Sequence, residues 1–323
     1  MELNSLPEDT EEINVYNKGI KSLDVRRFKN VKTLNCSNNK LTSLHLNENL
    51  QTLYCNNNKL TSLHLNENLQ TLHCDYNSLT SLHLNENLQT LYCYNNQLTS
   101  LHLNENLQTL SCSDNQFTSL HLNENLKTLS CSNNQLTSLD SKNLQYLSCF
   151  NNQLTSLHLN ENLQTLSCFN NQLTSLHLNE NLQTLSCSYN KLTSLHLNEN
   201  LQTLYCSDNQ LTSLHLNENL QTLNCSNNQL SSLHLNEKLQ TIVYNKNPIY
   251  QIINSDVIDI IKRKIKVLNH FRYLYYCLKF KKRLRDWLWV KIREPKIRIK
   301  YSHDYLLEHL HEDTDLDELL NNW

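Results

Sequence analysis

Cysteine and histidine, the side chains that most often bind metals or carry redox chemistry, recur in this chain at a fixed interval. Eleven cysteines lie 19 residues apart, except for one step of 18 from Cys131 to Cys149. Ten histidines follow the same interval, and a glutamate lies three residues after each of them. Stacked thiolates or imidazoles could hold a divalent ion. Duplication of a single unit would copy the same positions, however, and a metal site normally needs only three or four ligands with supporting partners. We therefore predict no metal site, no cofactor and no catalytic residue.

The interval itself predicts the fold. One unit, LQTLYCNNNKLTSLHLNEN at residues 50–68, divides into two halves that share the pattern L-x-x-L-x-(L/C)-x-x-N. Alternating apolar and polar residues indicate a short strand in each half, on two opposite walls of a coil. This is the leucine-rich-repeat pattern, whose units bury their apolar sides by stacking. We expect a leucine-rich-repeat solenoid of parallel β coils, about 19 residues per coil, with little or no helix within the repeats.

The repeating cysteines occupy a leucine position of the pattern, so we expect them in the core as reduced, small apolar side chains. A disulfide between coils is disfavoured, because strands stack about 4.8 Å apart whereas bonded Cβ atoms lie about 3.8 Å apart. An asparagine ends each first half, and we expect its buried amide to bind backbone groups of the turn. These residues are Asn39, Asn58, Asn77, Asn96, Asn115, Asn134, Asn152, Asn171, Asn190, Asn209, Asn228 and Asn247.

Three segments are expected. Residues 1–30 form a degenerate N-terminal capping repeat, residues 31–249 the solenoid, and residues 250–323 a helical C-terminal cap and tail. The repeat stops at Pro248, and helical spacing of apolar residues from 257 onward predicts a helix that covers the last coil. Residues 304–310 and 314–322 have the pattern of short helices. The tail is basic over 255–300, with 15 Lys and Arg against 4 Asp and Glu, and acidic over 301–323, with none against 7.

The half-units CSNNQLTSL and LHLNENLQTL resemble the short nested leucine-rich repeats of bacterial and giant-virus proteins. The near-identity of successive units, and a composition rich in Asn, Lys, Ile and Tyr, are more similar to proteins of giant DNA viruses of amoebae. Residues 287–296, with 301–304 and 315–323, resemble a C-terminal block that recurs in proteins of those viruses. The resemblance covers essentially the whole chain; it implies the fold and the origin but no activity.

Positions that vary on an otherwise copied scaffold are the candidate binding residues. We expect two groups of outward aromatic side chains on the main strands, residue types that anchor protein partners. Phe150 and Phe169 occupy the same position in consecutive coils, so their rings should stack about one strand spacing apart. Drift from serine by single-base changes is the alternative explanation of both groups. The candidates are Tyr54, His73, Tyr92 and Tyr94 in the early repeats and Tyr146, Phe150, Phe169 and Tyr189 in the middle.

The 18-residue unit lies beside the second group. Asp140 replaces the repeating histidine, Lys142 replaces the repeating glutamate, and one residue of the pattern is missing. The shorter unit either bends the solenoid or is a deletion tolerated at a turn. The histidine column should lie on the surface, since its position alternates with two leucines that are expected to be buried.

The basic segment, in which Lys and Arg alternate with aromatic residues, fits either an anionic partner such as nucleic acid or a helix that packs on acidic parts of the chain. Catalysis is not expected, because the only cysteine outside the repeats is Cys277 and a phosphate-binding loop is excluded by a single Gly. The leading hypothesis is a non-catalytic protein-interaction scaffold. The alternatives are an adaptor of host ubiquitin ligation acting through residues 255–323, and nucleic-acid binding by the basic segment.

The cysteine usage also bears on location. Reduced thiols, with no signal peptide at the N-terminus and no apolar run long enough to cross a membrane, predict a cytoplasmic protein that is not secreted, in the host cytoplasm if the origin is viral. The protein partner is not identified by any motif.

Overall fold

The computed structural model describes residues 9–281 continuously, together with residues 7, 283, 287, 290, 291, 294 and 295. The chain divides into two compact units, Met1–Lys262 and Arg263–Trp323. The first unit contains all the repeats.

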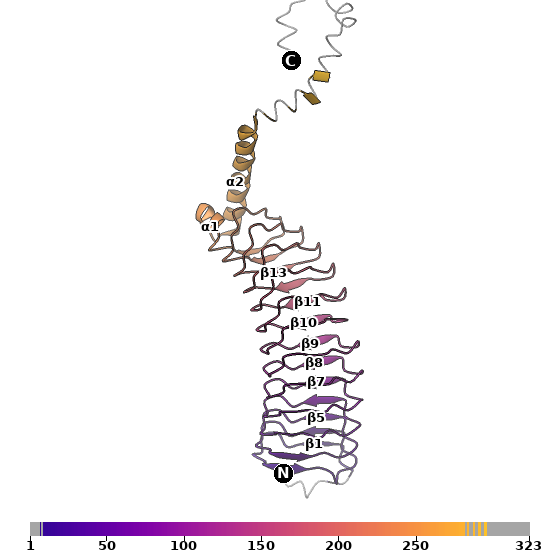
Figure 1. Cartoon of the computed structure of the whole chain (residues 1–323). Helices are drawn as coiled ribbons and strands as arrows, with labels where there is room; N and C mark the ends of the chain where they lie inside the picture. Colours follow the sequence, from indigo (N-terminus) through magenta and orange to yellow (C-terminus); the bar gives the residue numbers. More distant parts are fainter. Residues whose placement is uncertain are drawn as a thin grey trace, which may run out of the picture. The chain divides into compact units, whose positions relative to one another are not determined.

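A parallel sheet forms one wall of the coils, and Figure 1 shows its strands one above another along the stack. Thirteen strands of the described chain belong to it, and each pairs with its neighbour in sequence order. The strands are β1 (Glu12–Asn14), β3 (Thr33–Asn35), β5 (Thr52–Tyr54), β6 (Thr71–His73), β7 (Thr90–Tyr92), β8 (Thr109–Ser111), β9 (Thr128–Ser130), β10 (Tyr146–Ser148), β11 (Thr165–Ser167), β12 (Thr184–Ser186), β13 (Thr203–Tyr205), β14 (Thr222–Asn224) and β15 (Thr241–Val243).

Equivalent residues of successive coils are paired in this sheet. Leu53 is opposite Leu72, and Leu72 is opposite Leu91, so identical side chains form columns along the stack. Each central leucine is buried, while the residues on either side face outward, as the alternation predicts. The register persists across the 18-residue unit, where Leu147 pairs with both Leu129 and Leu166. The expected solenoid of short parallel coils without helices in the repeats is confirmed.

The opposite wall is less regular than the sequence predicts. Strands form there only between the first two coils, where β2 (Ser22–Asp24) pairs with β4 (Ser43–His45). Further along the described residues this wall shows single bridges, which join Asp140 to His158, His196 to His215, and His215 to His234. The expected second strand is therefore confirmed only at the start of the stack.

The asparagine that ends each first half forms the hydrogen bonds expected of it. The Asn115 amide nitrogen donates to the carbonyls of Cys93, Cys112 and Ser113 at 3.0 to 3.1 Å. Its oxygen accepts from the Leu98 backbone N–H at 2.9 Å. One side chain therefore satisfies backbone groups of two successive coils, which explains why this position requires asparagine in every unit.

The last coil is covered by a helix that sequence reasoning missed. Helix α1 (Pro248–Ile253) begins directly after the final asparagine, Asn247, and buries Ile249 and Ile253. The Ile249 N–H donates to the Leu230 carbonyl at 3.0 Å. Sequence analysis took Pro248 as the point where the repeat stops, but proline is also well suited to the first turn of a helix, where no N–H is needed.

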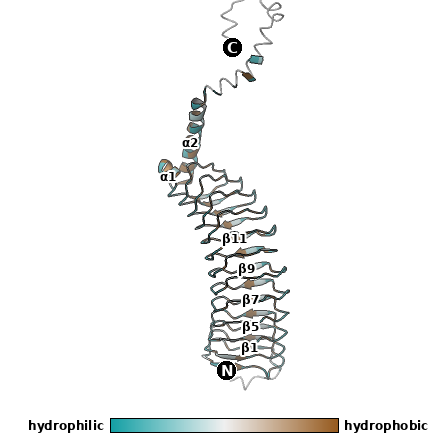
Figure 2. Cartoon of the chain, in the orientation of Figure 1, coloured by the Kyte–Doolittle hydropathy of each residue, from teal (hydrophilic) through white to brown (hydrophobic). Residues whose placement is uncertain are grey.

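The helix predicted from residue 257 onward is present as α2 (Ile258–Lys279), and Figure 2 shows both apolar and polar residues along it. Its first turn, within the first unit, buries Ile261, and the Lys262 ammonium donates to the Glu237 carbonyl at 2.8 Å. The short helices expected at 304–310 and 314–322, and the acidic tail, lie outside the described residues.

Candidate functional site

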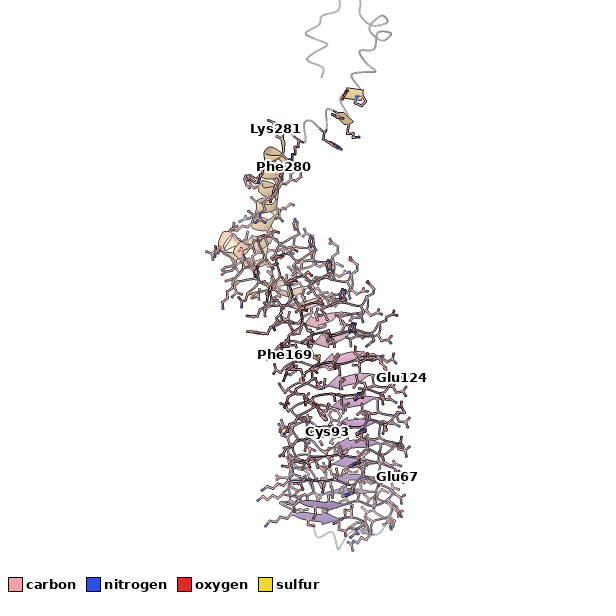
Figure 3. All side chains as sticks on the ribbon, in the orientation of Figure 1. Glu67, Cys93, Glu124, Phe169, Phe280 and Lys281 are labelled. Carbon is pink, nitrogen blue, oxygen red and sulfur yellow. The ribbon has the colours of Figure 1, made fainter. Side chains whose placement is uncertain are left out.

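The cysteine column lies in the core, as predicted. The eleven repeating thiols are free and fully buried, and Figure 3 shows Cys93 inside the stack with Glu67 and Glu124 at its edge. Burial disfavours the thiolate and raises the pKa of Cys36, Cys187 and Cys225 to about 12. Burial raises the pKa of the other repeating thiols as well. A protonated, inaccessible thiol is neither a nucleophile nor a metal ligand.

The wall opposite the sheet carries the repeating histidines and is called the histidine wall. It differs from the sequence expectation in one respect. The repeating histidines are exposed, as predicted, but the leucine that follows each of them is half-buried. The next residue, an asparagine, is buried in six of these ten coils and half-buried in the other four. For example, Leu122 is half-buried while Asn123 is 8% exposed and donates to the carbonyls of Asn104 and Leu107. The expectation of two buried leucines around each histidine is therefore wrong for the second one. Across the described residues, no three metal-ligating side chains come together.

The second aromatic group contains the predicted stack. The Phe150 and Phe169 ring centroids lie 4.4 Å apart with an interplanar angle of 8°. Because each ring covers a face of the other, both are half-buried rather than fully exposed. Tyr146, at the start of β10, is 41% exposed, and Tyr189 is 58% exposed. Two stacked apolar rings thus lie on the sheet wall between a tyrosine on a strand and a tyrosine at a turn.

The first aromatic group consists of two separate columns. Tyr54, His73 and Tyr92 stack along the strands, with ring centroids 4.8 and 4.4 Å apart. Tyr94 lies one column further along the coil and packs edge-to-face on Tyr76 at 5.2 Å. All four predicted members are half-buried, because neighbouring rings cover them. The sequence analysis treated these two columns as one group.

Sequence reasoning missed Tyr76, and the signal that would have identified it is its place in the turn. The residue before each repeating asparagine has a positive φ, between 50° and 57° along the described coils. Most coils place Asn or Asp there, the non-glycine residues that tolerate this left-handed conformation best. Tyr76 and Tyr189 adopt it with φ of 51° and 54°. A bulky residue in this conformation is strained, and such strain is concentrated at functional positions.

The 18-residue unit interrupts the inner asparagine column of the histidine wall. Ser141 occupies the inward place, and its hydroxyl donates to the His158 carbonyl at 2.6 Å. In the next coil the buried amide nitrogen of Asn160 has no hydrogen-bond partner, whereas its oxygen accepts from the Asn162 N–H at 2.8 Å. Lys142 forms an exposed ion pair with Glu124 at 3.4 Å. The deletion is thus absorbed on the histidine wall, opposite the Phe150 and Phe169 stack.

The basic segment is described mainly through α2. Exposed aromatic side chains along this helix include Phe271, Tyr273, Tyr275 and Tyr276, among several lysines and arginines. The described helices include none that is both long and apolar enough to cross a membrane. The side chain of Cys277, like most of residues 282–323, lies outside the described part of the chain.

No protein-family model matches the sequence, and a comparison with curated proteins finds no match either. Among solved structures, the chain is similar to YopM from Yersinia pestis, described as a leucine-rich effector protein, with 29% identity over 73% of this chain and 78% of that one, and a TM-score of 0.64. YopM from Yersinia enterocolitica WA-314 is 27% identical, with a TM-score of 0.63; the match covers 75% of this chain but just under two thirds, 66%, of that chain.

A leucine-rich-repeat protein of Leptospira interrogans is 24% identical over 76% of this chain and 95% of its own, with a TM-score of 0.55. This likeness supports the fold alone. Together with the observed coils, these neighbours show that the protein is a leucine-rich-repeat solenoid with a short helical C-terminal segment.

Proposed function

We propose that this protein is a non-catalytic protein-interaction scaffold and that the stacked pair of Phe150 and Phe169 is the centre of its binding surface. The observation that carries the proposal is the 4.4 Å ring stack on an otherwise copied, polar sheet wall. Large aromatic side chains with neighbouring tyrosines, here Tyr146 and Tyr189, are typical anchors of protein partners. Solenoids present such residues on extended surfaces, because each coil contributes one row.

Three further observations support a scaffold over an enzyme. The repeating thiols are buried and protonated, so they offer no nucleophile. The backbone groups of the sheet wall are paired between coils, which leaves side chains as the means of recognition. The fold is shared with YopM of Yersinia enterocolitica at 27% identity and with YopM of Yersinia pestis, a leucine-rich effector protein, at 29%. We also propose a reducing, cytoplasmic setting, which eleven free buried thiols favour.

The test is a double substitution, Phe150→Ser with Phe169→Ser, in the full chain. Serine is the residue that most other coils carry at this position, so the fold should survive. Partners captured from host-cell extract by the unaltered protein should bind the variant about thirty-fold more weakly, a loss of about 2 kcal/mol. Circular dichroism confirms folding, and Ser207→Ala, at the same position two coils beyond Phe169, is the matched control.

Unchanged binding by the double variant would remove these two rings from the interface. Capture of ubiquitin-ligase subunits through residues 255–323, or of nucleic acid that dissociates at high salt, would instead favour the adaptor or the nucleic-acid hypothesis.

A further inference from the structure

A buried carboxylate lies within the first aromatic group. Asp75 is 4% exposed and directly follows Cys74. Burial raises the pKa of this carboxyl, and hydrogen bonds from its own backbone and from the Tyr94 hydroxyl act in the opposite direction. The equivalent residues of the other coils carry no charge: they are Ser37, Asn56, Tyr94, Ser113, Ser132, Phe150, Phe169, Ser188, Ser207, Ser226 and Asn245.

This carboxylate has no cation beside it. The sheet-wall stretches of its own coil and of the coils on either side, residues 51–57, 70–76 and 89–95, contain neither Lys nor Arg. None of the residues that the structure describes forms an ion pair with Asp75. His73, the neighbouring base, is half-buried, and burial lowers its pKa, so it is neutral near pH 7. A buried charge without a counter-charge is costly, and proteins usually pair it.

The rings around Asp75 are held at a conformational cost. Tyr76 has a φ of 51° and is 45% exposed, and its ring meets the Tyr94 ring at 78° with centroids 5.2 Å apart. A left-handed conformation costs a bulky L-residue about 1–2 kcal/mol. Eight other coils place asparagine at this turn position, namely Asn17, Asn38, Asn57, Asn95, Asn133, Asn151, Asn170 and Asn227. Backbone strain, a buried carboxyl without a neighbouring cation and two nearly perpendicular rings therefore coincide in one place.

We propose that this cluster, Asp75 with Tyr76 and Tyr94, is a second recognition site that accepts an arginine side chain from a basic segment of the protein partner. A guanidinium is planar and weakly hydrated, so it stacks well on tyrosine rings. The Asp75 carboxyl, which accepts from the Tyr94 hydroxyl, is buried, so its field is little screened and attracts the cation. Residues 1–254 hold 13 Lys and Arg against 20 Asp and Glu, which favours the approach of a basic partner.

This inference rests on the proposed scaffold function but uses a different surface from Phe150 and Phe169. The two sites lie on the same sheet wall, three coils apart between Tyr94 and Phe150, which is about 14 Å at the spacing of paired strands. One partner could therefore place an arginine on the first site and an apolar side chain on the second.

The probe is a library of seven-residue peptides displayed on phage and selected against the full chain. We expect selected peptides to be enriched in arginine, and a synthetic copy with citrulline in place of arginine to bind about tenfold more weakly, because only the charge is lost. Asp75→Asn should lower the affinity for the arginine peptide to a similar extent. Asparagine already occurs at this position as Asn56 and Asn245, so the variant should fold, which circular dichroism verifies. Asp208→Asn, seven coils away, removes the same charge and should change affinity less than about twofold.

Two results would overturn the inference: selected peptides without arginine enrichment, or arginine peptides that bind Asp75→Asn as tightly as the unaltered chain. Peptides that depend only on Phe150 and Phe169 would also refute it, but would leave the scaffold function standing. Failure to select any peptide, together with failure to capture any protein, would count against both.

Discussion

The two walls of each coil arise from nearly the same half-repeat, yet they are ordered differently. On the sheet wall, strands pair continuously from β1 to β15, and each closing asparagine uses both its amide nitrogen and its oxygen. On the histidine wall, most coils of the described chain lack a strand. Apart from Asn160, the inner asparagines there donate through nitrogen, but the buried oxygens of Asn47, Asn66, Asn85, Asn123, Asn179 and Asn198 have no hydrogen-bond partner.

The position of the asparagine within the half-repeat accounts for this difference. In the first half Asn58 lies three residues after the last inward residue, Cys55, so the strand is complete before the turn begins. In the second half Asn66 directly follows Leu65, and its amide donates to the Glu48 and Leu50 carbonyls of the preceding coil. We infer that this early turn shortens the extended segment and leaves Leu65 partly outside. The comparison teaches that one consensus can give a rigid wall and a looser one, depending on where the turn amide lies.

The largest expected effect is alkaline loss of stability, which acts through the cysteines of the sheet wall. The folded-state pKa of each repeating thiol is raised, to about 12 for Cys36, Cys187 and Cys225. The unfolded chain therefore releases these protons first, near pH 8.5, so stability is complete below that pH and falls as the pH rises toward the folded-state values. Above about pH 8.5, each repeating thiol should lower the free energy of unfolding by about 1.4 kcal/mol per pH unit.

Urea unfolding followed by circular dichroism between pH 7 and 9.5 measures this loss. In a Cys112→Val/Cys131→Val variant, hydrogen exchange should show that the two altered coils retain protection at the upper end of this range. A urea midpoint that stays constant between pH 7 and 9.5 would show that the thiols are not buried in the core. Rapid reaction of the native thiols with iodoacetamide at pH 7 would show the same.

A direct comparison of the walls uses two asparagines that are both 8% exposed, Asn115 and Asn123. Asn115→Ala removes three donated bonds and one accepted bond on the sheet wall. Asn123→Ala removes two donated bonds on the histidine wall. We expect losses in the free energy of unfolding of about 3 kcal/mol for Asn115→Ala and about 1.5 kcal/mol for Asn123→Ala, because each buried group left unpaired costs about 1 kcal/mol or more. Equal losses in urea titrations would contradict the difference between the walls.

The smallest expected effect is a gain in stability at the turns of the sheet wall. Tyr76→Asn and Tyr189→Asn replace a strained tyrosine by the residue that most coils use there. Each should raise the free energy of unfolding by about 1 kcal/mol, because asparagine tolerates positive φ better than tyrosine does. Tyr146→Thr, which restores the usual strand residue at a position without positive φ, is the control. Destabilisation by both turn substitutions would show that packing of the tyrosine rings outweighs the backbone strain.

Local pattern was sufficient to predict much of this protein. The 19-residue interval, the L-x-x-L-x-(L/C)-x-x-N halves and the asparagine after each strand predicted the parallel coils, the buried thiols and the amide hydrogen bonds. The stack of Phe150 on Phe169 followed from their equal position in consecutive coils. These features depend on which residues recur at one place in the repeat, and the sequence states that directly.

Features that depend on how neighbouring coils fit together were decided only by the tertiary structure. Leu122 and Asn123 have exchanged the inward place that alternation assigns, because a turn amide that binds carbonyls of the preceding coil outweighs the burial of one leucine. Helix α1 closes the last coil where a terminator was expected. Asp75 is an ordinary polar residue in the sequence; in the structure it is a buried carboxyl, because the next coil places the Tyr94 hydroxyl within hydrogen-bonding distance of it.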